Sequence, residues 1–382
     1  MALVEVFSLR NKLPFYWRLT TSFDNEFETP NELDFEFTIL DGLLSTVRTP
    51  ELLESLTKVY SLDYNIGYIQ EDYDIAQPFV EDFRKFLFKY SDQLNPKANV
   101  LEIGCGGAVL LKELKDSGLN CVGVDPSPTA LRASEKYGFE LVPSFFDSSA
   151  FSAKFDLIFH SDVLEHSFDP MEFISDQRKI LNRDGIIVVS VPDATENIKH
   201  GDISIAMHQH LQYFSADSLR ALMMNSGFEI LEIRTAGYGG SLYCAARKID
   251  HTKGNIQLGH LDLKTPLPNF QDSVNRFIQL LSHMEGNIGF YVPLRTLPYL
   301  CASGIDMKNC NFRFFDDTAH WHGCHFDGTA IPIENFQDIV KNPPDIIFIM
   351  SLTFEKPIKE KLLEHFGSQI RLITLRDVLT IE

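Results

Sequence analysis

The stretch VLEIGCGGA, Val100–Ala108, decides the fold, and the stretch VGVDPS, Val122–Ser127, follows it along the chain. In both, a short apolar run ends in polar or glycine residues: the first ends on glycines, the second on the carboxylate of Asp125. Glycines let the backbone turn tightly and approach a ligand, and a carboxylate after the next strand can accept hydrogen bonds from ribose hydroxyls. The pair of stretches predicts a nucleotide-binding α/β sheet.

The residues around the glycines indicate which nucleotide would bind. A dinucleotide fingerprint, GxGxxG, needs a glycine at position 109, where this chain has Val109. Glu102 instead precedes Gly104 and Gly106 in the order E-x-G-x-G. A carboxylate there attracts a cationic ligand such as a sulfonium and repels a pyrophosphate. One alternative stays open, in which the glycines serve only helix packing and Asp125 caps a helix.

Strand-like and helix-like segments alternate on both sides of these stretches. The runs ANVLEIG, NCVGVD, FDLIFHS and GIIVVSV are separated by amphipathic segments such as 110–117 and 171–181. Two later runs, Phe228–Thr235 and Ser241–Arg247, are joined by AGYGG. This order predicts an α/β fold with a Rossmann-like sheet that ends in an antiparallel hairpin.

A second, smaller α/β series follows a polar bridge. Its expected strands are Asn287–Val292, Asn311–Phe315, Asp345–Met350 and Arg371–Leu375. We therefore expect an N-terminal region on the substrate side at 1–95, a nucleotide-binding domain at 96–248, a linker at 249–269 and a C-terminal Rossmann-like domain at 270–382. In the N-terminal region, no clear strand alternation is visible beyond the first few residues.

Composition narrows the class of protein. With 34 Lys and Arg against 53 Asp and Glu, the formal net charge is −19, which argues against nucleic acid or an anionic membrane as a partner. The six cysteines are scattered without a CxxC pair, and no apolar run approaches membrane-spanning length. These features predict a cytoplasmic protein and leave its oligomeric state open.

Four motifs in order carry a resemblance to a known family: VLEIGCGGA, VGVDPS, the FFD at Phe145–Asp147, and FDLIFHSDVLEHSFDP at Phe155–Pro170. Over about 150 residues the chain resembles class I S-adenosylmethionine-dependent methyltransferases. The resemblance implies S-adenosylmethionine as cofactor. It places the following residues around that cofactor: Glu102, Gly104 and Gly106 at the methionine part, Asp125 on the ribose, Phe146 and Asp147 near the adenine, and Ser161 beside the cofactor after the fourth strand.

A more distant resemblance covers the rest of the chain. His208–Ile230, Phe314–Ile333 and Pro343–Ile358 are similar to segments of sugar C-methyltransferases, in which a C-terminal α/β domain closes over a nucleotide-linked sugar. It implies a small-molecule acceptor, such as a nucleotide-activated sugar. The chain departs from that family in two ways. It has no cysteine before Cys105, so we expect the family's N-terminal zinc module to be missing. It also has Gln209 before His210, where the family has the acid of an acid–histidine pair.

Methyl transfer from a sulfonium needs an oriented acceptor and, where the acceptor carries a proton, a base. His210 and His166 are the candidates for that base, and each can alternatively be a hydrogen-bonded structural residue. Tyr64 and Tyr68 are candidate substrate contacts, although their spacing of four also fits the buried face of a helix. Gln209 and Arg295 are further substrate candidates.

The segment Cys310–Asp327 offers three histidines and two cysteines, but their spacings match no common zinc pattern. We interpret it as a polar loop at the domain interface that brings Asp317 and His320 to the substrate, and we expect no metal site. A metal-binding loop is the alternative.

Two classes of function remain open. The first is an S-adenosylmethionine-dependent methyltransferase that modifies carbon or oxygen of a nucleotide-activated sugar or related metabolite, or else oxygen or nitrogen of a natural product. The second is a catalytically silent binding or scaffold protein that keeps the fold, which the change of the acid to Gln209 makes conceivable.

Overall fold

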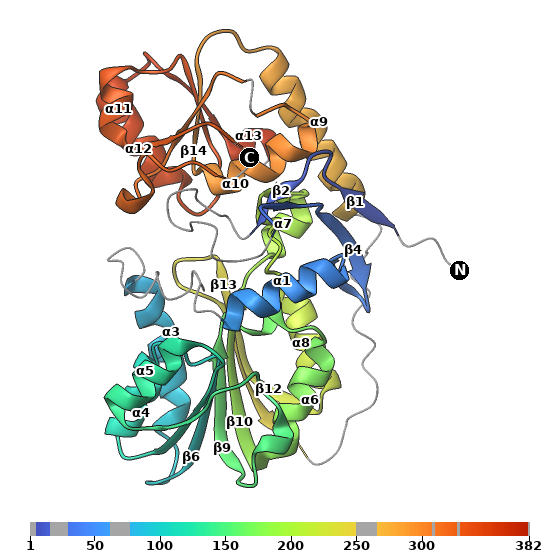
Figure 1. Cartoon of the computed structure of the whole chain (residues 1–382), viewed down its shortest axis with the longest axis vertical. Coiled ribbons are helices and arrows are strands. Elements are labelled where there is room, and N and C mark those ends of the chain that lie inside the picture. The colour runs from blue at the N-terminus through green and yellow to red at the C-terminus, as the bar shows by residue number, and fades with distance from the viewer. Residues whose placement is uncertain are drawn as a thin grey trace.

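The computed structural model describes residues 5–15, 30–61, 77–249, 266–307, 310–326 and 329–380. The chain forms two lobes (Figure 1). The lower lobe contains a seven-stranded sheet, the upper lobe a five-stranded sheet, and strands from the N-terminal region lie beside the junction of the two lobes (Figure 1).

The seven-stranded sheet has the order β12-β13-β10-β9-β6-β7-β8. Its strands are β6 (Asn99–Ile103), β7 (Asn120–Val124), β8 (Glu140–Val142), β9 (Phe155–Ser161), β10 (Leu181–Pro192), β12 (Phe228–Thr235) and β13 (Ser241–Lys248). Neighbouring strands are parallel except at β13, which runs antiparallel to both β10 and β12. The predicted fold class, a Rossmann-like sheet with a terminal antiparallel hairpin, is confirmed.

Helices cover both faces of this sheet. Side chains of β6 alternate, so that Val100 packs on one face and Leu101 on the other. The face with Val100 is covered by α3 (Gln77–Ser91), α4 (Val109–Asp116) and α5 (Pro128–Tyr137); the opposite face is covered by α6 (Pro170–Ile180) and α8 (Ala216–Asn225). Strands buried on both faces explain the continuous apolar runs seen in the sequence.

The upper lobe contains an all-parallel sheet in the order β16-β15-β14-β17-β18. Its strands are β14 (Ile288–Tyr291), β15 (Phe312–Phe315), β16 (Ile333–Glu334), β17 (Ile346–Ile349) and β18 (Arg371–Thr374). Its helices are α9 (Pro266–Ser282), α10 (Pro293–Ser303), α11 (Phe336–Lys341), α12 (Glu355–Phe366) and α13 (Leu375–Leu379). Four of these strands lie where the sequence predicts them, and β16 was not predicted.

Two expectations need correction. Helix α9 begins at Pro266, inside the stretch 249–269 that we expected to be a linker, because proline is well suited to the first turn of a helix. The N-terminal region also contains more strand than expected. A four-stranded sheet is formed by β1 (Val6–Ser8), β4 (Glu36–Leu40), β5 (Leu43–Thr46) and, from the middle of the chain, β11 (Gln212–Tyr213). In addition, β2 (Leu13–Pro14) pairs with β3 (Glu32–Leu33).

One hydrophobic core joins the N-terminal strands to the upper lobe. Phe37 of β4 and Tyr213 of β11 belong to the same buried cluster as Phe270 of α9 and Phe290 of β14. Nearby, a Cβ atom added to Gly201 would lie 2.4 Å from the backbone of Asn269, so the segment before η4 (Ile203–Ile205) approaches α9 closely. The two lobes are therefore packed together through buried residues.

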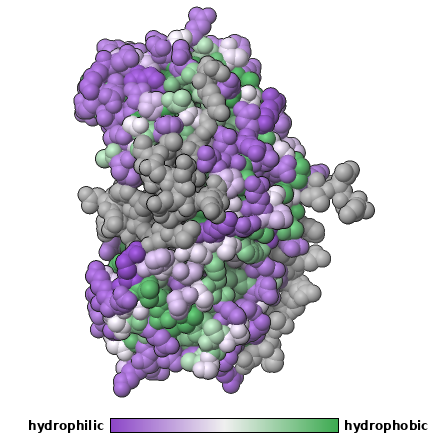
Figure 2. Space-filling view, in the orientation of Figure 1, coloured by the Kyte–Doolittle hydropathy of each residue, from purple (hydrophilic) through white to green (hydrophobic). Residues whose placement is uncertain are grey.

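The surface is mixed in character. Figure 2 shows mainly hydrophilic residues over the upper lobe and a patch of apolar residues on the lower lobe. Val109, Leu131 and Phe145 are among the exposed apolar side chains of the lower lobe. Among the described residues, no helix is both long enough and apolar enough to cross a membrane.

Candidate active site

The glycine loop after β6 has the backbone geometry that the sequence predicts. Gly104 and Gly106 have positive φ angles of 69° and 45°, a conformation that glycine adopts without strain. A Cβ atom added to Gly104 would lie only 2.6 Å from Cγ2 of Val163, which follows β9. The glycine loop and the loop after β9 are thus in close contact at the carboxyl edge of the sheet, where ligands of such folds bind.

Asp125 fixes the geometry of this edge. Its buried carboxylate accepts hydrogen bonds from the backbone N–H of Gly106, at 3.0 Å, and of Ser127, at 2.8 Å. Helix α5 is capped by Ser127, whose hydroxyl accepts from the Ala130 N–H, and not by Asp125. Glu102 is buried on β6. The cofactor roles assigned to these residues stay predictions.

The residues expected near the adenine and beside the cofactor lie at or after the carboxyl ends of the neighbouring strands. Phe146 packs against Phe151 and Phe173, while Asp147 is exposed and caps the short helix η2 (Ser148–Ala150). Ser161 ends β9 and donates a hydrogen bond to the Asp162 carboxylate at 3.2 Å. Phe146 and Asp147 therefore lie between β8 and η2, and Ser161 is the last residue of β9.

Glu165, His166 and His210 form a cluster beside the loop after β9. One donor atom from each of the three lies within 4.8 Å of the others. Nε2 of His166 is 3.7 Å, and Nε2 of His210 is 4.0 Å, from Oε1 of Glu165. The side chain of Glu165 is 1% exposed, and those of His166 and His210 are 19% and 17% exposed. The structure therefore brings both predicted bases together around a buried acid.

Backbone contacts from three segments hold this cluster in place. The Leu211 N–H donates to the Glu165 carbonyl at 2.8 Å, and the Thr46 hydroxyl of β5 donates to the His210 carbonyl at 2.7 Å. Nδ1 of His166 lies 2.7 Å from the carbonyl oxygen of Gln209. Because a carbonyl only accepts, Nδ1 carries the proton, and Nε2 of His166, which is 3.7 Å from Oε1 of Glu165, keeps its lone pair.

Burial dominates the protonation of the cluster. Burial lowers the pKa of His166 to about 4 and lowers the pKa of His210 well below its usual value, with additional lowering by His166 and Arg295. Burial also raises the pKa of Glu165 well above that of an ordinary carboxyl, and the neighbouring Asp162 raises it further. Both imidazoles are therefore neutral at pH 7 and can accept a proton or bind a cation.

One predicted substrate residue of the upper lobe acts electrostatically on this cluster. Arg295 lies on α10, its guanidinium donates to the Ser204 carbonyl at 3.3 Å, and its charge acts on His210. Gln209 is buried beside His210, and its side-chain oxygen has no hydrogen-bond partner among the described residues.

The other predicted substrate residues lie elsewhere or outside the described part. Asp317 follows β15 and accepts hydrogen bonds from Tyr291, at 2.8 Å, and Lys361, at 2.6 Å, both of the upper lobe. His320 is exposed in η5 (Ala319–Trp321) at the same edge. Tyr64 and Tyr68 fall outside the described residues.

Glu165 was not among the residues predicted from the sequence, although it directly precedes His166 in DVLEH. An acid directly beside a candidate base in the sequence was the signal that could have identified Glu165. We expected no metal site, yet among the residues that the structure describes, Glu165, His166 and His210 are close enough together to share an ion.

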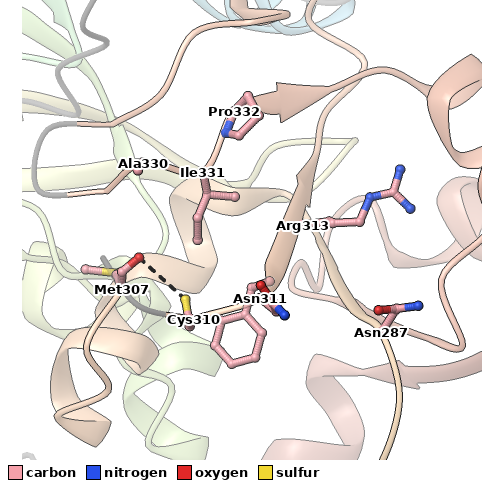
Figure 3. A pocket seen from close by; sticks show the side chains of 9 residues that line it. Asn287, Met307, Cys310, Asn311, Arg313, Ala330, Ile331 and Pro332 are labelled. Carbon is pink, nitrogen blue, oxygen red and sulfur yellow. Dashed lines mark hydrogen bonds between the residues drawn. The ribbon is translucent and has the colours of Figure 1, made fainter.

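A separate hollow of about 300 Å³ lies in the upper lobe (Figure 3). Asn287, Asn311 and Pro332 line it, and they directly precede β14, β15 and β16. It is therefore at the amino ends of the parallel strands, whereas ligand sites of such sheets lie at the carboxyl ends.

Comparison with known proteins agrees with the geometry of the lower lobe. Residues 73–233 match the family model described as a methyltransferase domain. The chain carries a class I S-adenosylmethionine-dependent methyltransferase domain. S-adenosylmethionine is its cofactor, as the motifs predict, and the sequence-based recognition of the family is confirmed.

Relatives of the methyltransferase domain differ in the atom they methylate. The C-methyltransferase NovU of Streptomyces niveus is 23% identical over 311 residues, which is 74% of each chain. A ubiquinone biosynthesis O-methyltransferase of Actinobacillus pleuropneumoniae is 29% identical over 122 residues, or 27% of this chain and 52% of that protein. In the solved structure of the 1,6-didemethyltoxoflavin-N1-methyltransferase of Burkholderia thailandensis, the similar region covers 56% of this chain and 96% of the other, with 16% identity and a TM-score of 0.41.

Proposed function

We propose that this chain transfers the methyl group of S-adenosylmethionine to a carbon or oxygen atom of a nucleotide-activated sugar that binds between the two lobes. Glu102, Gly104, Gly106 and Asp125 hold the methionine and ribose parts of the cofactor, with Phe146, Asp147 and Ser161 along its remaining length. The cluster of Glu165, His166 and His210 faces the acceptor.

The position of Arg295 is the observation that favours a nucleotide sugar as the acceptor. Arg295 belongs to the upper lobe, yet its charge acts on His210 of the lower lobe. A guanidinium matches the geometry and charge of phosphate oxygens, so the diphosphate of a nucleotide sugar is a suitable partner at this place. The similarity to the C-methyltransferase NovU supports the proposal because it extends over 311 residues, well beyond the methyltransferase domain.

The chemistry of the transfer requires an acceptor that loses a proton. The O–H or C–H bond of the acceptor breaks, and its electron pair forms the bond to the methyl carbon. The S–CH₃ bond breaks in the same step, and its electron pair stays on sulfur, which leaves S-adenosylhomocysteine. A neutral imidazole of the cluster of Glu165, His166 and His210 accepts the proton, and holding the acceptor in line with the methyl group lowers the barrier further.

The alternative of a silent binding protein rested on Gln209, which replaces the acid of an acid–histidine pair. Glu165 lies 4.0 Å from Nε2 of His210 and provides a carboxylate from another segment. The site therefore retains an acid next to the histidine, which favours an enzyme.

Calorimetric titration of nucleoside diphosphate sugars into the chain saturated with S-adenosylhomocysteine tests the acceptor class. Arg295→Ala should weaken binding at least tenfold, since a charge-assisted hydrogen bond contributes about 1.5–3 kcal/mol. Lys359→Ala, which removes an exposed cation of the same lobe, should leave binding unchanged. If no nucleotide sugar binds, or if Arg295→Ala binds as tightly as the natural chain, the proposed acceptor is wrong.

A further inference from the structure

We propose that Glu165, His166 and His210 hold one divalent transition-metal ion, and that an oxygen atom of the acceptor completes its coordination. The second half of this inference rests on the proposed function, whereas the metal site itself does not.

The donor set suits such an ion. Two neutral imidazoles and one carboxylate bind Zn²⁺ in hydrolytic enzymes and bind Fe²⁺ or similar ions in other proteins, and in both cases positions remain open for a ligand. Nothing else in the described part of the chain groups three donors of this kind.

The two distances from Glu165 to the histidines are too long for hydrogen bonds but fit two ligands of one ion. The two Nε2 atoms lie 3.7 Å and 4.0 Å from Oε1 of Glu165. Hydrogen bonds between such atoms are roughly 2.7–3.2 Å long. Two donor atoms that are each about 2.0–2.2 Å from one ion lie roughly 3–4 Å apart.

The carboxylate of Glu165 is buried and lacks a side-chain partner among the described residues. Its side chain is 1% exposed, and among the described residues neither of its oxygens has a hydrogen-bond partner. An isolated buried carboxylate is costly, and buried charges are normally paired or bound to a metal. Asp162 adds a second acid whose charge acts on Glu165. The positive charge of Arg295 acts on His210 and partly offsets the two acids.

The surroundings of His166 resemble those of a metal-bound histidine. Its Nδ1–H donates to the Gln209 carbonyl at 2.7 Å. Histidine ligands commonly donate their second ring N–H to a backbone carbonyl, which fixes the ring and the tautomer. In this chain that hydrogen bond leaves the lone pair of Nε2, which is 3.7 Å from Oε1 of Glu165, available to bind an ion.

A metal at this place would activate either kind of acceptor. With the ion bound, water takes the acceptor proton in place of the histidines. A coordinated hydroxyl loses that proton more readily, and a coordinated carbonyl stabilises the negative charge that forms when a neighbouring C–H bond loses its proton. In both cases an acceptor oxygen binds the ion and the methyl group is transferred to the electron-rich oxygen or carbon.

Measuring the metal content of the chain tests the proposed metal site without any acceptor present. The full chain is treated with EDTA, dialysed and titrated with Zn²⁺ and Mn²⁺, and the bound metal is counted by plasma mass spectrometry and followed by calorimetry. We expect one equivalent to bind to the natural chain. Glu165→Gln and His210→Ala should weaken binding at least tenfold, while S-adenosylmethionine still binds both, which shows that they are folded.

His200→Ala is the matched control. His200 forms a surface pair with Glu196 at 3.1 Å, so its loss should not alter metal binding. Equal metal binding by Glu165→Gln, or no binding by the natural chain, would overturn the proposed site. Turnover that persists in EDTA would overturn the metal while leaving the methyltransferase proposal intact, and turnover that returns with Mn²⁺ or Zn²⁺ would support it.

Discussion

Asp125 is the residue on which we expect the cofactor site to depend most. Its carboxylate holds the Gly106 and Ser127 N–H groups, and so ties the loop after β6 to the start of α5. The same carboxylate is expected to accept hydrogen bonds from the ribose of S-adenosylmethionine. Its loss would affect both the shape of the loop and the ligand contact.

We therefore expect Asp125→Ala to weaken the binding of S-adenosylmethionine more than tenfold, because the loop loses its anchor and the ribose loses its acceptor. Calorimetry on the folded variant measures the effect. Asp116→Ala, which removes an exposed acid at the end of α4, is the control and should bind normally. An unchanged affinity of Asp125→Ala would contradict the assigned cofactor site.

Helix α3 is fixed to the terminal hairpin by a bidentate ion pair. Asp82 of α3 accepts hydrogen bonds from Arg234 of β12, at 3.2 Å and 3.0 Å, and from the Gly237 N–H, at 2.8 Å. The Arg234 guanidinium also lies over the rings of Phe86 and Tyr243. The arrangement keeps α3 on the face of the sheet.

The stability that this pair contributes should depend on pH. The hydrogen bond from Arg234 lowers the pKa of Asp82, so the folded chain binds this proton more weakly than the unfolded chain does. The stabilisation is present above the unfolded pKa, about 3.9, and is lost as the pH falls through the lower pKa of the folded chain. We expect Asp82→Asn to reduce the free energy of unfolding by about 1 kcal/mol at neutral pH.

Denaturant titrations at neutral and acidic pH check this prediction. The difference between the natural chain and Asp82→Asn should shrink as the pH falls through the lowered pKa of Asp82. Asp116→Asn, at an exposed pair with Lys112, should show a smaller difference at neutral pH. A difference for Asp82→Asn that stays constant down to acidic pH would rule out the ionised pair as its cause.

The elements differ in how far the sequence could predict them. The strands of both parallel sheets could be predicted because burial on two faces produces continuous apolar runs. The hairpin of β4 and β5 was missed, although Asp41 and Gly42 both adopt the positive φ angles that an Asp-Gly hairpin turn requires. Two-residue strands such as β11 and β16 are too short to leave a pattern in the sequence.

The active-site cluster shows why motifs alone predicted only part of the site. The glycine loop and Asp125 could be predicted because local backbone geometry defines them. The proximity of Glu165 and His210 could not be predicted. It depends on the pairing of β11 with β5 and on the hydrogen bond from Thr46 to the His210 carbonyl. Such contacts between distant segments follow from tertiary packing.

At the scale of the whole molecule, the two lobes and the N-terminal strands act as one unit. The core that contains Phe37 and Tyr213 also contains Phe290. The Tyr299 hydroxyl of α10 donates to the buried Asp202 carboxylate at 3.1 Å. The upper lobe is thus held against the segment that leads to His210, and the charge of Arg295 reaches that histidine. We therefore expect both lobes to contribute to the acceptor site.

Transfer of an isotopically labelled methyl group by the full chain tests the account most directly. S-adenosylmethionine labelled in its methyl carbon is incubated with a panel of nucleoside diphosphate sugars, and the products are analysed by mass spectrometry. We predict that the label appears in the sugar part of one of these compounds and that S-adenosylhomocysteine forms in equal amount. A chain that binds S-adenosylmethionine yet labels only phenols, amines or other acceptors without a nucleotide, and none of the nucleotide sugars, would contradict the account.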